Sequence, residues 1–380
     1  MKFLLIYVPN LRFNNDPYKK YNLYEFATRV TRKNKDNVSN LPLTISAQYG
    51  LVDQVSFFNK TVASKDMSGY YLLKNGEFAY NKSYSNDYPW GAIKRLDLYD
   101  MGCLSTLYIC FKTNDNIVNS NYLVHYFESS KWHKQVADIA GEGARNHGLL
   151  NIGVNDFFNT KHAVPTIENQ IKIAGFLDLI EKRIQTQIKI IDDYNSLKMG
   201  IYNCMFKENY ADYKLKQLAY IVKGDQINND QLLSNGSYYM MNGGASPSGY
   251  LDSYNVSENT ISISEGGNSC GYVQFNSSPF WSGGHCYTIQ NVNSALIENK
   301  YLYHYLKYKE KEIMNLRIGT GLPNIQKKDL ENFTILVPSL LIQRKNLALF
   351  EMLDEKISIL NEELANLQKQ KKYLLCNMFI

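Results

Sequence analysis

The sequence predicts a mixed α/β protein in which two globular domains alternate with two long helices as an internal repeat. Three observations support this prediction. One block of residues occurs twice, each copy is followed by a stretch with helical spacing of apolar residues, and the segments between the copies contain short strand-like runs. With 380 residues, 44% of them hydrophobic, the chain is long enough for two or three domains with ordinary cores.

The repeated block reads ARNHGLLNIGVNDFFNTKHAVPTIENQ in its first copy and GTGLPNIQKKDLENFTILVPSLLIQ in its second. The two copies align without a gap, and the match continues to Met205-Phe206 and Met378-Phe379. A duplication of roughly sixty residues is hard to obtain by chance and predicts a doubled architecture. Matching positions, each 173 residues apart, are Gly148 and Gly321, Asn151 and Asn324, Ile152 and Ile325, Asp156 and Asp329, Asn159 and Asn332, Val164 and Val337, Pro165 and Pro338, and Gln170 and Gln343.

A long helix is predicted after each copy, because apolar residues recur there at intervals of three and four. Pro165 and Pro338 stand just before the two stretches, where proline is tolerated. At about 1.5 Å per residue each helix is expected to be roughly 50 Å long, too long to pack only on its own domain, so the two copies are expected to pair. Gln187 and Lys198 interrupt the first seam and face either the partner helix or another subunit. The predicted seam residues are Ile173, Leu177, Ile180, Ile184, Ile191, Phe350, Leu353, Ile357, Leu360, Leu364 and Leu367.

The two globular domains, one before each repeated region, correspond to each other more loosely. Strand-like runs broken by Gly and Asn favour small mixed α/β domains, each with a helix at its YLxHY segment. The predicted division is residues 1–150, a first variable domain; 151–209, the first repeated region with its helix; 210–322, a second variable domain; and 323–380, the second repeated region with its helix. Corresponding segments are YKKYNLYEFA (18–27) with YADYKLKQLA (210–219), and YLVHYF (122–127) with YLYHYL (301–306). The strand-like runs are 41–47, 77–83, 105–112, 259–267 and 270–275.

Composition excludes several classes of protein. The apolar run FLLIYV (3–8) is too short to span a membrane and lacks a cleavage site, so a cytoplasmic location is expected. The six cysteines form no CxxC pair and the six histidines no HxxxH pattern, so no metal is expected. A net charge of +5 is less basic than that of a self-sufficient nucleic-acid binder.

Motifs of catalysis are missing from the sequence. It contains no GxxxxGKS/T loop and no nucleophile elbow. GGNSCG (266–271) lies between two strand-like runs instead of opening a helix, which disfavours a nucleotide cradle. SPFW (278–281) is the closest approach to the tetrapeptide of an adenine methyltransferase, but it lacks one proline and no FxGxG loop precedes it. The chain is therefore predicted to be non-catalytic by itself.

Residues suited to recognition are present in both domains. MNGGASPSGYLDSYN (241–255) offers Asn, Ser and Tyr on a loop whose glycines let the backbone approach a ligand. No Lys or Arg occurs between Lys223 and Lys300, although phosphate neutralisation usually supplies much of the affinity for DNA. Basic residues at the rim are Lys214, Lys216, Lys300, Lys307 and Arg317, and those of the first domain are Lys60, Lys82, Lys94, Arg95 and Arg145, interleaved with Tyr84, Tyr88 and Trp90.

The repeated GxxNIxxxDxxNxxxxVP block with its trailing heptads resembles the specificity subunits of type I restriction-modification systems. The resemblance covers essentially the whole chain, including VPNLRF (8–13) and the GGASPSGY and GGNSCGYV segments. It implies an α/β fold with two target-recognition domains separated by two long antiparallel coiled-coil helices, a pseudo-twofold internal repeat. It also implies that the chain reads a bipartite double-stranded DNA site and docks two methyltransferase subunits, which use S-adenosylmethionine, with restriction subunits as further partners.

Carried onto this sequence, the resemblance points to two sets of DNA-binding residues. For the first half-site these are Tyr49, Lys82, Tyr84, Lys94, Arg95 and Arg145. For the second half-site they are Asn242, Ser246, Ser248, Tyr250, Asn268, Ser269, His285 and Arg317. Two alternatives remain open: a recognition partner of a fused methyltransferase-nuclease, and a coiled-coil scaffold that binds protein or glycan. The scarcity of basic residues in the second domain favours the scaffold, and the ungapped duplication opposes it.

Overall fold

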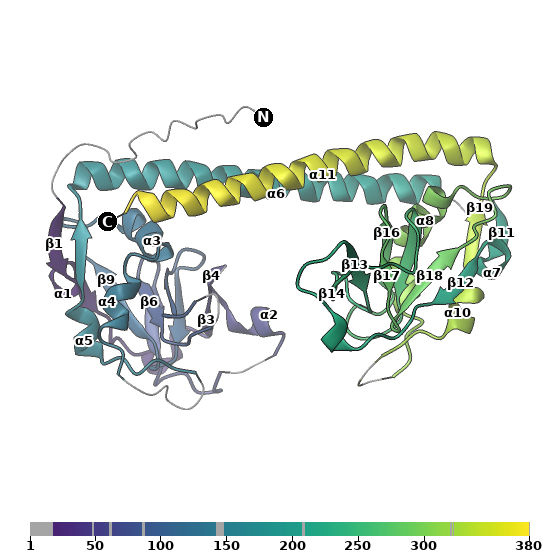
Figure 1. The fold of residues 1–380 in the computed structure, drawn as a ribbon. Helices are drawn as coiled ribbons and strands as arrows, with labels where there is room; N and C mark the ends of the chain where they lie inside the picture. The colour runs from purple at the N-terminus through teal and green to yellow at the C-terminus, as the bar shows by residue number, and fades with distance from the viewer. Residues whose placement is uncertain are drawn as a thin grey trace. The chain divides into compact units, whose positions relative to one another are not determined.

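The computed structural model describes residues 18–47, 49–60, 63–85, 88–141, 148–206, 210–319, 321 and 323–379. Contacts divide the chain into two compact units, Met1–Gln187 with Glu363–Ile380, and Ile188–Glu362. Each unit contains one variable domain and a part of both long helices (Figure 1). The predicted boundaries at residues 150, 209 and 322 were drawn from the sequence repeat, whereas these two units are defined by contacts. The predicted division therefore stays a prediction.

Two long helices carry the heptad pattern: α6 (Ile167–Met205) and α11 (Leu340–Asn377). Each begins two residues after the proline of the repeated block. Proline has no backbone N–H to donate, so it is disfavoured inside a helix but tolerated at its start. Of the eleven predicted seam residues, Ile180, Ile357 and Leu364 are half-buried and the other eight are buried. The apolar stripe is therefore the buried face of both helices.

Within the first unit the two helices run antiparallel. Gln187 Nε2 lies 3.1 Å from Glu363 Oε2, and Lys371 Nζ lies 2.7 Å from Glu181 Oε2. The residue numbers fall along α6 as they rise along α11, which defines opposite directions. Gln187, which interrupts the seam, therefore faces the partner helix in this unit.

The same direction holds within the second unit. Lys198 pairs with Asp354, and the rings of Tyr202 and Phe350 pack edge to face with centroids 4.8 Å apart. Lys198, the other polar interruption of the seam, is thereby directed at α11. Neither polar position is left facing solvent in the unit that contains it.

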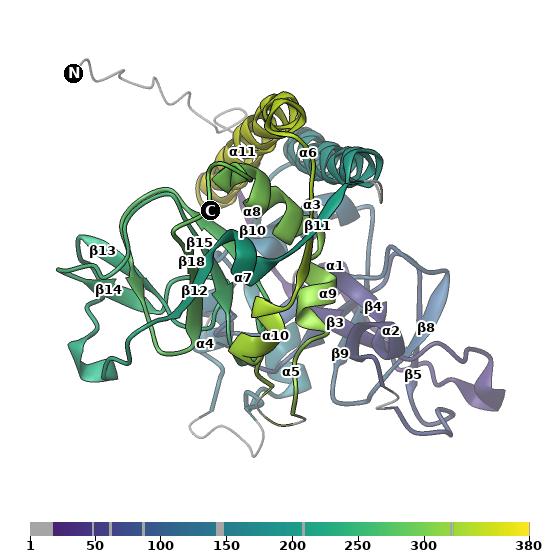
Figure 2. The ribbon, with the colours of Figure 1, turned by 90° about the vertical axis from the view of Figure 1, so that its right-hand side faces the viewer.

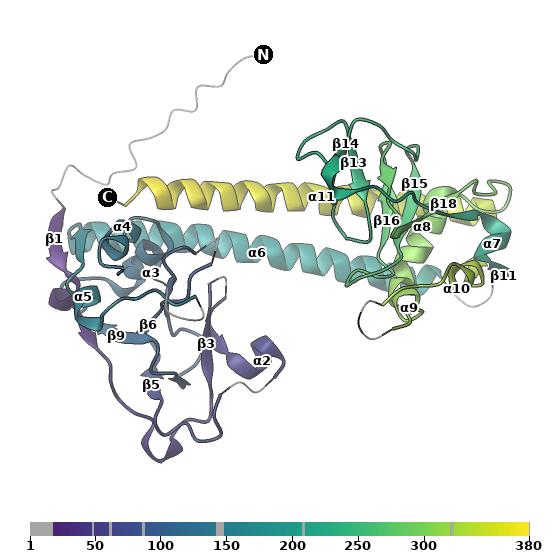
Figure 3. The ribbon, with the colours of Figure 1, turned by 60° about the horizontal axis from the view of Figure 1, so that its bottom comes forward.

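The variable domain of the first unit is built from short strands, as its Gly- and Asn-broken runs predict. Its largest sheet is four-stranded and antiparallel, in the order β2-β9-β6-β7. Three separate two-stranded sheets accompany it: β3-β4, β5-β8 and β1-β10. α2 follows β4 along the chain, and Figure 3 shows it beside β3. The strands are β1 (Lys19–Asn22), β2 (Ala27–Arg29), β3 (Leu43–Ser46), β4 (Gly50–Asp53), β5 (Tyr71–Lys74), β6 (Phe78–Asn81), β7 (Ala92–Arg95), β8 (Met101–Leu104), β9 (Ile109–Thr113) and β10 (Lys161–Val164). The short helices are α1 (Leu23–Phe26), α2 (Gln54–Phe58), α3 (Ser120–Glu128), α4 (His133–Ala137) and α5 (Val154–Phe158).

The second unit has a related but shorter set of strands. A four-stranded antiparallel sheet has the order β12-β18-β15-β16, and a three-stranded sheet has the order β14-β13-β17. Figure 2 labels β12, β15 and β18 of the first sheet and β13 and β14 of the second. The strands are β11 (Ala211–Lys214), β12 (Tyr220–Lys223), β13 (Tyr238–Met241), β14 (Gly249–Leu251), β15 (Thr260–Ser264), β16 (Val273–Asn276), β17 (Trp281–Ser282), β18 (Cys286–Gln290) and β19 (Thr334–Val337). The short helices are α7 (Leu215–Leu218), α8 (Asn299–Tyr308), α9 (Glu310–Met314) and α10 (Lys327–Glu331).

The core of each unit joins its domain to its share of the long helices. In the first unit Leu177 and Phe379, both buried, pack with Tyr122 of α3 in one apolar cluster. In the second, Phe206 and Phe350 pack with Tyr301 of α8 in the same way. The YLxHY segments are thus helices that bury their aromatic face against α6 and α11.

Gln170 and Gln343, the last identical residues of the repeated block, make the same three hydrogen bonds. Gln170 accepts from Asn119 N at 2.6 Å and donates to Pro165 O and Ile117 O. Gln343 accepts from Glu298 N at 2.8 Å and donates to Pro338 O and Leu296 O. A buried amide satisfied on both ends fixes the start of a long helix to its domain, once in each unit.

These observations confirm the predicted fold class and the internal repeat. The β1-β10 and β11-β19 ladders pair the segments that begin each domain with the ends of the repeated blocks. No helix in the described ranges is both long and apolar enough to cross a membrane. VPNLRF (8–13) lies outside the described residues.

Candidate nucleic-acid interface

Three of the predicted residues of the first domain, Tyr49, Lys94 and Arg95, line one cleft. Tyr49 stands on the β3-β4 hairpin with 64% of its surface exposed. Lys94 Nζ is 3.4 Å from Glu128 Oε1, and its side chain is only 15% exposed. Of these three residues, Tyr49 is therefore the one open to a ligand.

Glu128 explains why Lys94 is withdrawn. Its other oxygen is 2.9 Å from Lys371 Nζ of α11, so one carboxylate joins the domain sheet to the long helix. Burial raises the pKa of Glu128, but the charges of Lys94 and Lys371 outweigh it and hold that pKa below its ordinary value. Lys94 is thus engaged in a structural ion-pair network.

Arg95 is held by three side chains. Its Nε lies 2.6 Å from Asp97 Oδ1, and its Nη1 donates to Ser120 Oγ and Asn121 Oδ1 at 2.9 and 2.8 Å. The contacts fix the guanidinium at the N-terminus of α3. A base-reading role for Arg95 would require it to leave these partners.

Lys82 and Tyr84 lie apart from that cleft, at the exit of β6. Lys82 Nζ is 3.4 Å from Ile152 O, and Tyr84 N donates to Gly148 O at 3.1 Å. Tyr84 has 47% of its surface exposed. Both residues adjoin the repeated block, and Arg145 lies outside the described residues.

The second domain brings its predicted residues together more closely. Asn242, Ser248, Asn268, Ser269 and His285 line one cleft of about 580 Å³, along with four glycines and Asn324 of the repeated block. Ser246, Tyr250 and Arg317 are exposed but stand outside its lining. Segments 241–255 and 266–271, which the family resemblance singled out, therefore both contribute to the lining of this cleft.

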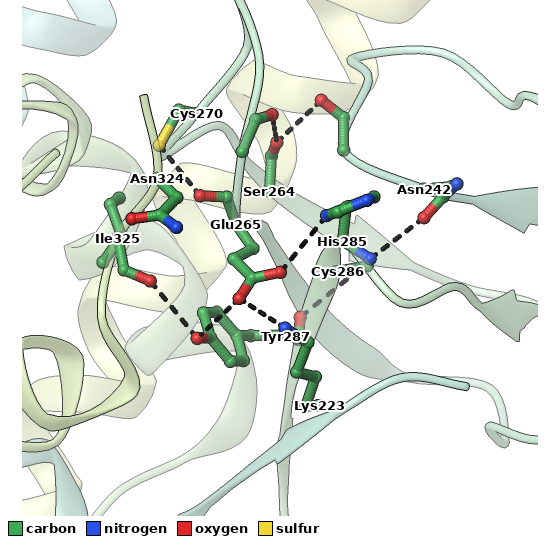
Figure 4. Close-up of polar contacts among 12 residues, drawn as sticks. Lys223, Asn242, Ser264, Glu265, Cys270, His285, Cys286, Tyr287, Asn324 and Ile325 are labelled. Carbon is green, nitrogen blue, oxygen red and sulfur yellow. Dashed lines mark hydrogen bonds and ion pairs between the residues drawn. The ribbon is translucent and has the colours of Figure 1, made fainter. Parts of the chain in front are cut away.

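Strand register builds the floor of this cleft. In the sheet, Lys223 of β12 stands opposite Tyr287 of β18, and Ser264 of β15 stands opposite Cys286. Glu265 follows β15 and its backbone N donates to His285 O at 2.9 Å. The side chains of Lys223, Glu265 and His285 consequently converge (Figure 4).

Glu265 is the centre of the polar contacts in the cleft. Its side chain is 9% exposed, and its Oε1 lies 2.6 Å from Lys223 Nζ and 3.1 Å from the Tyr287 hydroxyl. Burial, and then the charge of Glu265, raise the pKa of Tyr287, so its hydroxyl remains a donor. Glu265 Oε2 is buried without a hydrogen bond in the described structure, 3.5 Å from His285 Nδ1.

His285 and Asn242 form the side of the cleft. Asn242 Oδ1 accepts the His285 backbone N–H at 3.0 Å, while the His285 side chain is 60% exposed. Gly243 has φ +79°, and a Cβ on it would lie 3.2 Å from both Gly266 O and His285 Cβ. Glycine at this position therefore lets the two segments approach each other.

The repeated block closes the cleft from behind. Ile325 N donates to Glu265 O at 2.9 Å, and Gly266 forms an isolated bridge with Asn324. The Tyr287 hydroxyl is 3.2 Å from Ile325 O. In the first unit the matching carbonyl, Ile152 O, is instead approached by Lys82, so the same backbone group supports a different side chain in each domain.

Sequence reasoning missed Lys223, Glu265 and Tyr287. In the sequence, Lys223 marks only the edge of the region without basic residues. A signal for Glu265 was available, because it continues the alternate positions of Ile261 and Ile263, which are buried. An acid at such a position predicts a buried charge with partners. Its partners could not be named, because Lys223 and Tyr287 come from distant strands.

The chemistry of this cleft is that of hydrogen bonding. It presents an ammonium group, an imidazole, amides and hydroxyls from Lys223, His285, Asn242, Asn268 and Ser269. Within the described ranges no group of three or more His, Cys, Asp or Glu side chains is placed to hold a metal ion. Such donors and acceptors suit the edges of bases and the phosphates of a nucleic acid.

Comparison with known proteins supports this interpretation. Residues 207–369 match the family model described as the type I restriction modification DNA specificity domain. A putative type I specificity subunit of Mycoplasma pneumoniae is 34% identical over 155 residues, which are 40% of this chain and 41% of that protein. One from Mycoplasma genitalium is 32% identical over 127 residues, which are 33% of each protein. The chain thus aligns with well under half the length of these curated relatives.

Longer matches are more distant. A putative type I restriction enzyme MjaX specificity subunit of Methanocaldococcus jannaschii is 22% identical over 297 residues, 70% of this chain and 69% of that protein. The crystal structure of a type I restriction-modification S subunit from M. genitalium superposes with a TM-score of 0.62 at 18% identity, covering 98% of this chain and 99% of that one. It shares the fold of this chain. Residues 207–369 thus match the type I restriction modification DNA specificity domain, and the chain as a whole shares the fold of that S subunit.

Proposed function

We propose that this chain is the sequence-recognition subunit of a type I restriction-modification complex. Each variable domain reads one half of a bipartite double-stranded DNA target, and the repeated framework docks methyltransferase subunits and, in the complete system, restriction subunits. The observation that carries the proposal is the repetition of one framework around two different surfaces. Gln170 and Gln343 make the same contacts, while the side chains above Ile152 O and Ile325 O differ.

A framework of this kind separates two tasks. Identical surfaces can be recognised by identical subunits, and the loops they support are free to differ in what they read. Two readers on one chain also gain affinity, because binding of one raises the effective concentration of the other. This gain suits a second domain whose sequence carries no Lys or Arg between Lys223 and Lys300.

Catalysis is assigned to the partner subunits. In this proposal the methyltransferase subunits bind S-adenosylmethionine, and this chain supplies no catalytic group and no cofactor site. The role requires access to genomic DNA, so the proposed location is the cytoplasm.

The test is methylome sequencing of a methylation-free host that expresses this chain together with the methyltransferase encoded beside it. The control expresses the methyltransferase alone. We expect a new split motif with N6-methyladenine on both strands only when both proteins are present. The absence of new methylation from an intact, co-purifying complex would contradict the proposal and favour the scaffold role.

The division of labour between the domains is tested with two variants of exposed residues. Tyr84→Ala is expected to relax the first half of the motif and His285→Ala the second, because direct readout is local to the contacted base pairs. Variants that altered both halves alike would argue against one half-site per domain. Nuclease activity that depends on the same methyltransferase polypeptide would identify a fused methyltransferase-nuclease as the partner.

A further inference from the structure

The second domain has to bind DNA with a loop region that lacks basic residues. No Lys or Arg occurs from residue 224 to residue 299. Lys223, the last basic residue before that region, nevertheless lines the cleft together with Asn242, Asn268 and His285. The fold thus returns one ammonium group to the middle of the domain.

The ammonium group is held there by a buried acid. Lys223 Nζ lies 2.6 Å from Glu265 Oε1, and the Lys223 side chain is half exposed while that of Glu265 is 9% exposed. The carboxylate is itself oriented by Tyr287, whose hydroxyl lies 3.1 Å from the same oxygen. An ammonium carries three N–H donors, so one bond to Glu265 leaves two to aim at a ligand in the cleft.

Glu265 also determines what kind of ligand suits Lys223. A free lysine favours phosphate because it carries a full positive charge that releases counterions. Here the carboxylate at 2.6 Å offsets that charge, and a phosphate entering the cleft would meet the field of Glu265 as well. A neutral group with hydrogen-bond acceptors meets the two directed donors without that repulsion.

Guanine is the base whose major-groove edge offers such acceptors side by side, at O6 and N7. We infer that Lys223, positioned by Glu265, reads the acceptor edge of a guanine in the second half-site. Glu265 acts through Lys223 and is a positioning residue. The inference rests on the proposed function, since it concerns one base pair of the target that the second domain reads.

His285 stands on the other side of the same carboxylate. Its Nδ1 is 3.5 Å from Glu265 Oε2, which has no hydrogen bond in the described structure. A ring turned this way directs Nε2 away from Glu265. His285 therefore flanks Lys223 on the cleft wall, and its exposed ring offers a further polar group beside the paired donors of the Lys223 ammonium.

The experiment compares the methylomes of hosts that express the methyltransferase with the wild-type chain, Lys223→Met, Lys223→Arg or Glu265→Gln. Lys311→Met, an exposed lysine on α9, is the control for loss of one positive charge. We expect Lys223→Met to lower the preference for guanine at one position of the second half-site by about 5- to 150-fold, the range of one good base contact. Lys223→Arg should retain guanine there, because arginine donates to the same two acceptors. The first half of the motif should be unchanged in every variant, which also reports that the complex has assembled.

Glu265→Gln has a signature that a purely structural residue lacks. It keeps an oxygen for Lys223 but removes the negative charge, so the lysine becomes an ordinary phosphate binder. The motif should relax at the same position, while the affinity of the complex for random-sequence duplex DNA rises. The slope of the logarithm of the binding constant against the logarithm of salt concentration should become steeper by about one unit. A residue needed only for folding would lower both specific and random-sequence binding.

Two results would overturn the inference alone. A Lys223→Met chain that keeps the motif but methylates all sites more slowly would make Lys223 a phosphate contact. A Lys223→Met chain indistinguishable from Lys311→Met would remove the cleft from the DNA interface. A wild-type chain that directs no split motif would instead contradict the proposed function itself, and the two failures are therefore distinguishable.

Discussion

Lys371 Nζ lies 2.7 Å from Glu181 Oε2, joining α11 to α6 inside the first unit. The residues 173 positions away, Lys198 and Asp354, form the corresponding ion pair inside the second unit. An ion pair that recurs at the repeat offset belongs to the framework and is independent of what each domain reads. It extends the duplication from sequence identity to side-chain chemistry, since Asp354 stands where the first copy has glutamate.

The first prediction concerns Lys371. Its side chain is 19% exposed and pairs with both Glu181 and Glu128, so Lys371→Met leaves Glu181 without this cation and Glu128 with Lys94 alone. We expect the free energy of unfolding of the first unit to fall by about 1–3 kcal/mol, the cost of losing a hydrogen bond to a charged group. Urea denaturation followed by hydrogen exchange of each unit measures this. Lys372→Met, at an exposed neighbouring position, is the control and should change stability little.

A second prediction concerns the paired glutamines. Gln170→Leu and Gln343→Leu each remove three hydrogen bonds and leave a backbone N–H and two carbonyls unpaired. Each substitution is expected to destabilise its own unit by about 2–4 kcal/mol. Hydrogen exchange should show the loss at the β1-β10 ladder for Gln170→Leu and at β11-β19 for Gln343→Leu. Equal loss in both units from either variant would refute the correspondence, and Gln368→Leu on the exposed face of α11 should be neutral.

The third prediction is a pH dependence. Burial lowers the pKa of His162 to about 4, and burial with the charges of Lys198 and Lys300 lowers that of His304 to about 3. A depressed pKa means that the unfolded chain takes up the proton first as pH falls below about 6.5. Stability is therefore fully present above pH 6.5 and is lost between there and pH 3 to 4, by about 1.4 kcal/mol per pH unit for each histidine.

The measurement is the urea midpoint of each unit at pH 7.5, 6.5 and 5.5. His304→Gln is expected to be less stable than the wild-type chain at pH 7.5, because it loses the 2.7 Å contact with the Tyr202 hydroxyl. Its second unit should nevertheless lose stability less steeply on acidification. An unchanged acid slope in this variant would show that His304 is not the titrating group.

A fourth prediction concerns the thiols. Cys204 and Cys376 are exposed, whereas Cys103, Cys110, Cys270 and Cys286 are buried. Burial raises the pKa of the Cys110 thiol to about 12 and that of Cys286 to about 11, which further suppresses the reactive thiolate. Iodoacetamide at pH 7.5 is expected to modify the two exposed thiols in the native chain and all six after unfolding, as read by mass spectrometry. Cys286 labelling as fast as Cys204 would mean that the second domain opens in solution.

Much of the framework could be predicted because its signals are local. The heptad spacing placed α6 and α11, and the YLxHY segments were recognised as α3 and α8 because periodicity and helical geometry act over a few residues. Alternating apolar runs likewise located β3, β6, β9, β15 and β16. The constant offset between the two copies then indicated that each local structure occurs twice.

The binding surfaces were less accessible to the same reasoning. Lys94 and Arg95 look like DNA contacts in the sequence, yet Glu128 of α3 engages Lys94, and Ser120 and Asn121 of α3 bind Arg95 beside its neighbour Asp97. The contacts from α3 depend on how that helix packs on β7. Tyr49 and Tyr84, in contrast, are exposed where a loop composition predicts. The charge of a lysine or arginine does not by itself show whether the side chain forms an internal ion pair or is exposed to bind a ligand.

The sequence by itself indicated the repeat, the long helices and the resemblance to type I specificity subunits, together with several residues of the second cleft. Tertiary structure alone decided which side chains meet inside that cleft. Lys223 and Glu265 are separated by 42 residues, and Tyr287 comes from a third strand. Their meeting follows from the order β12-β18-β15 and its register, which are set by long-range pairing and burial and not by any local pattern of residues.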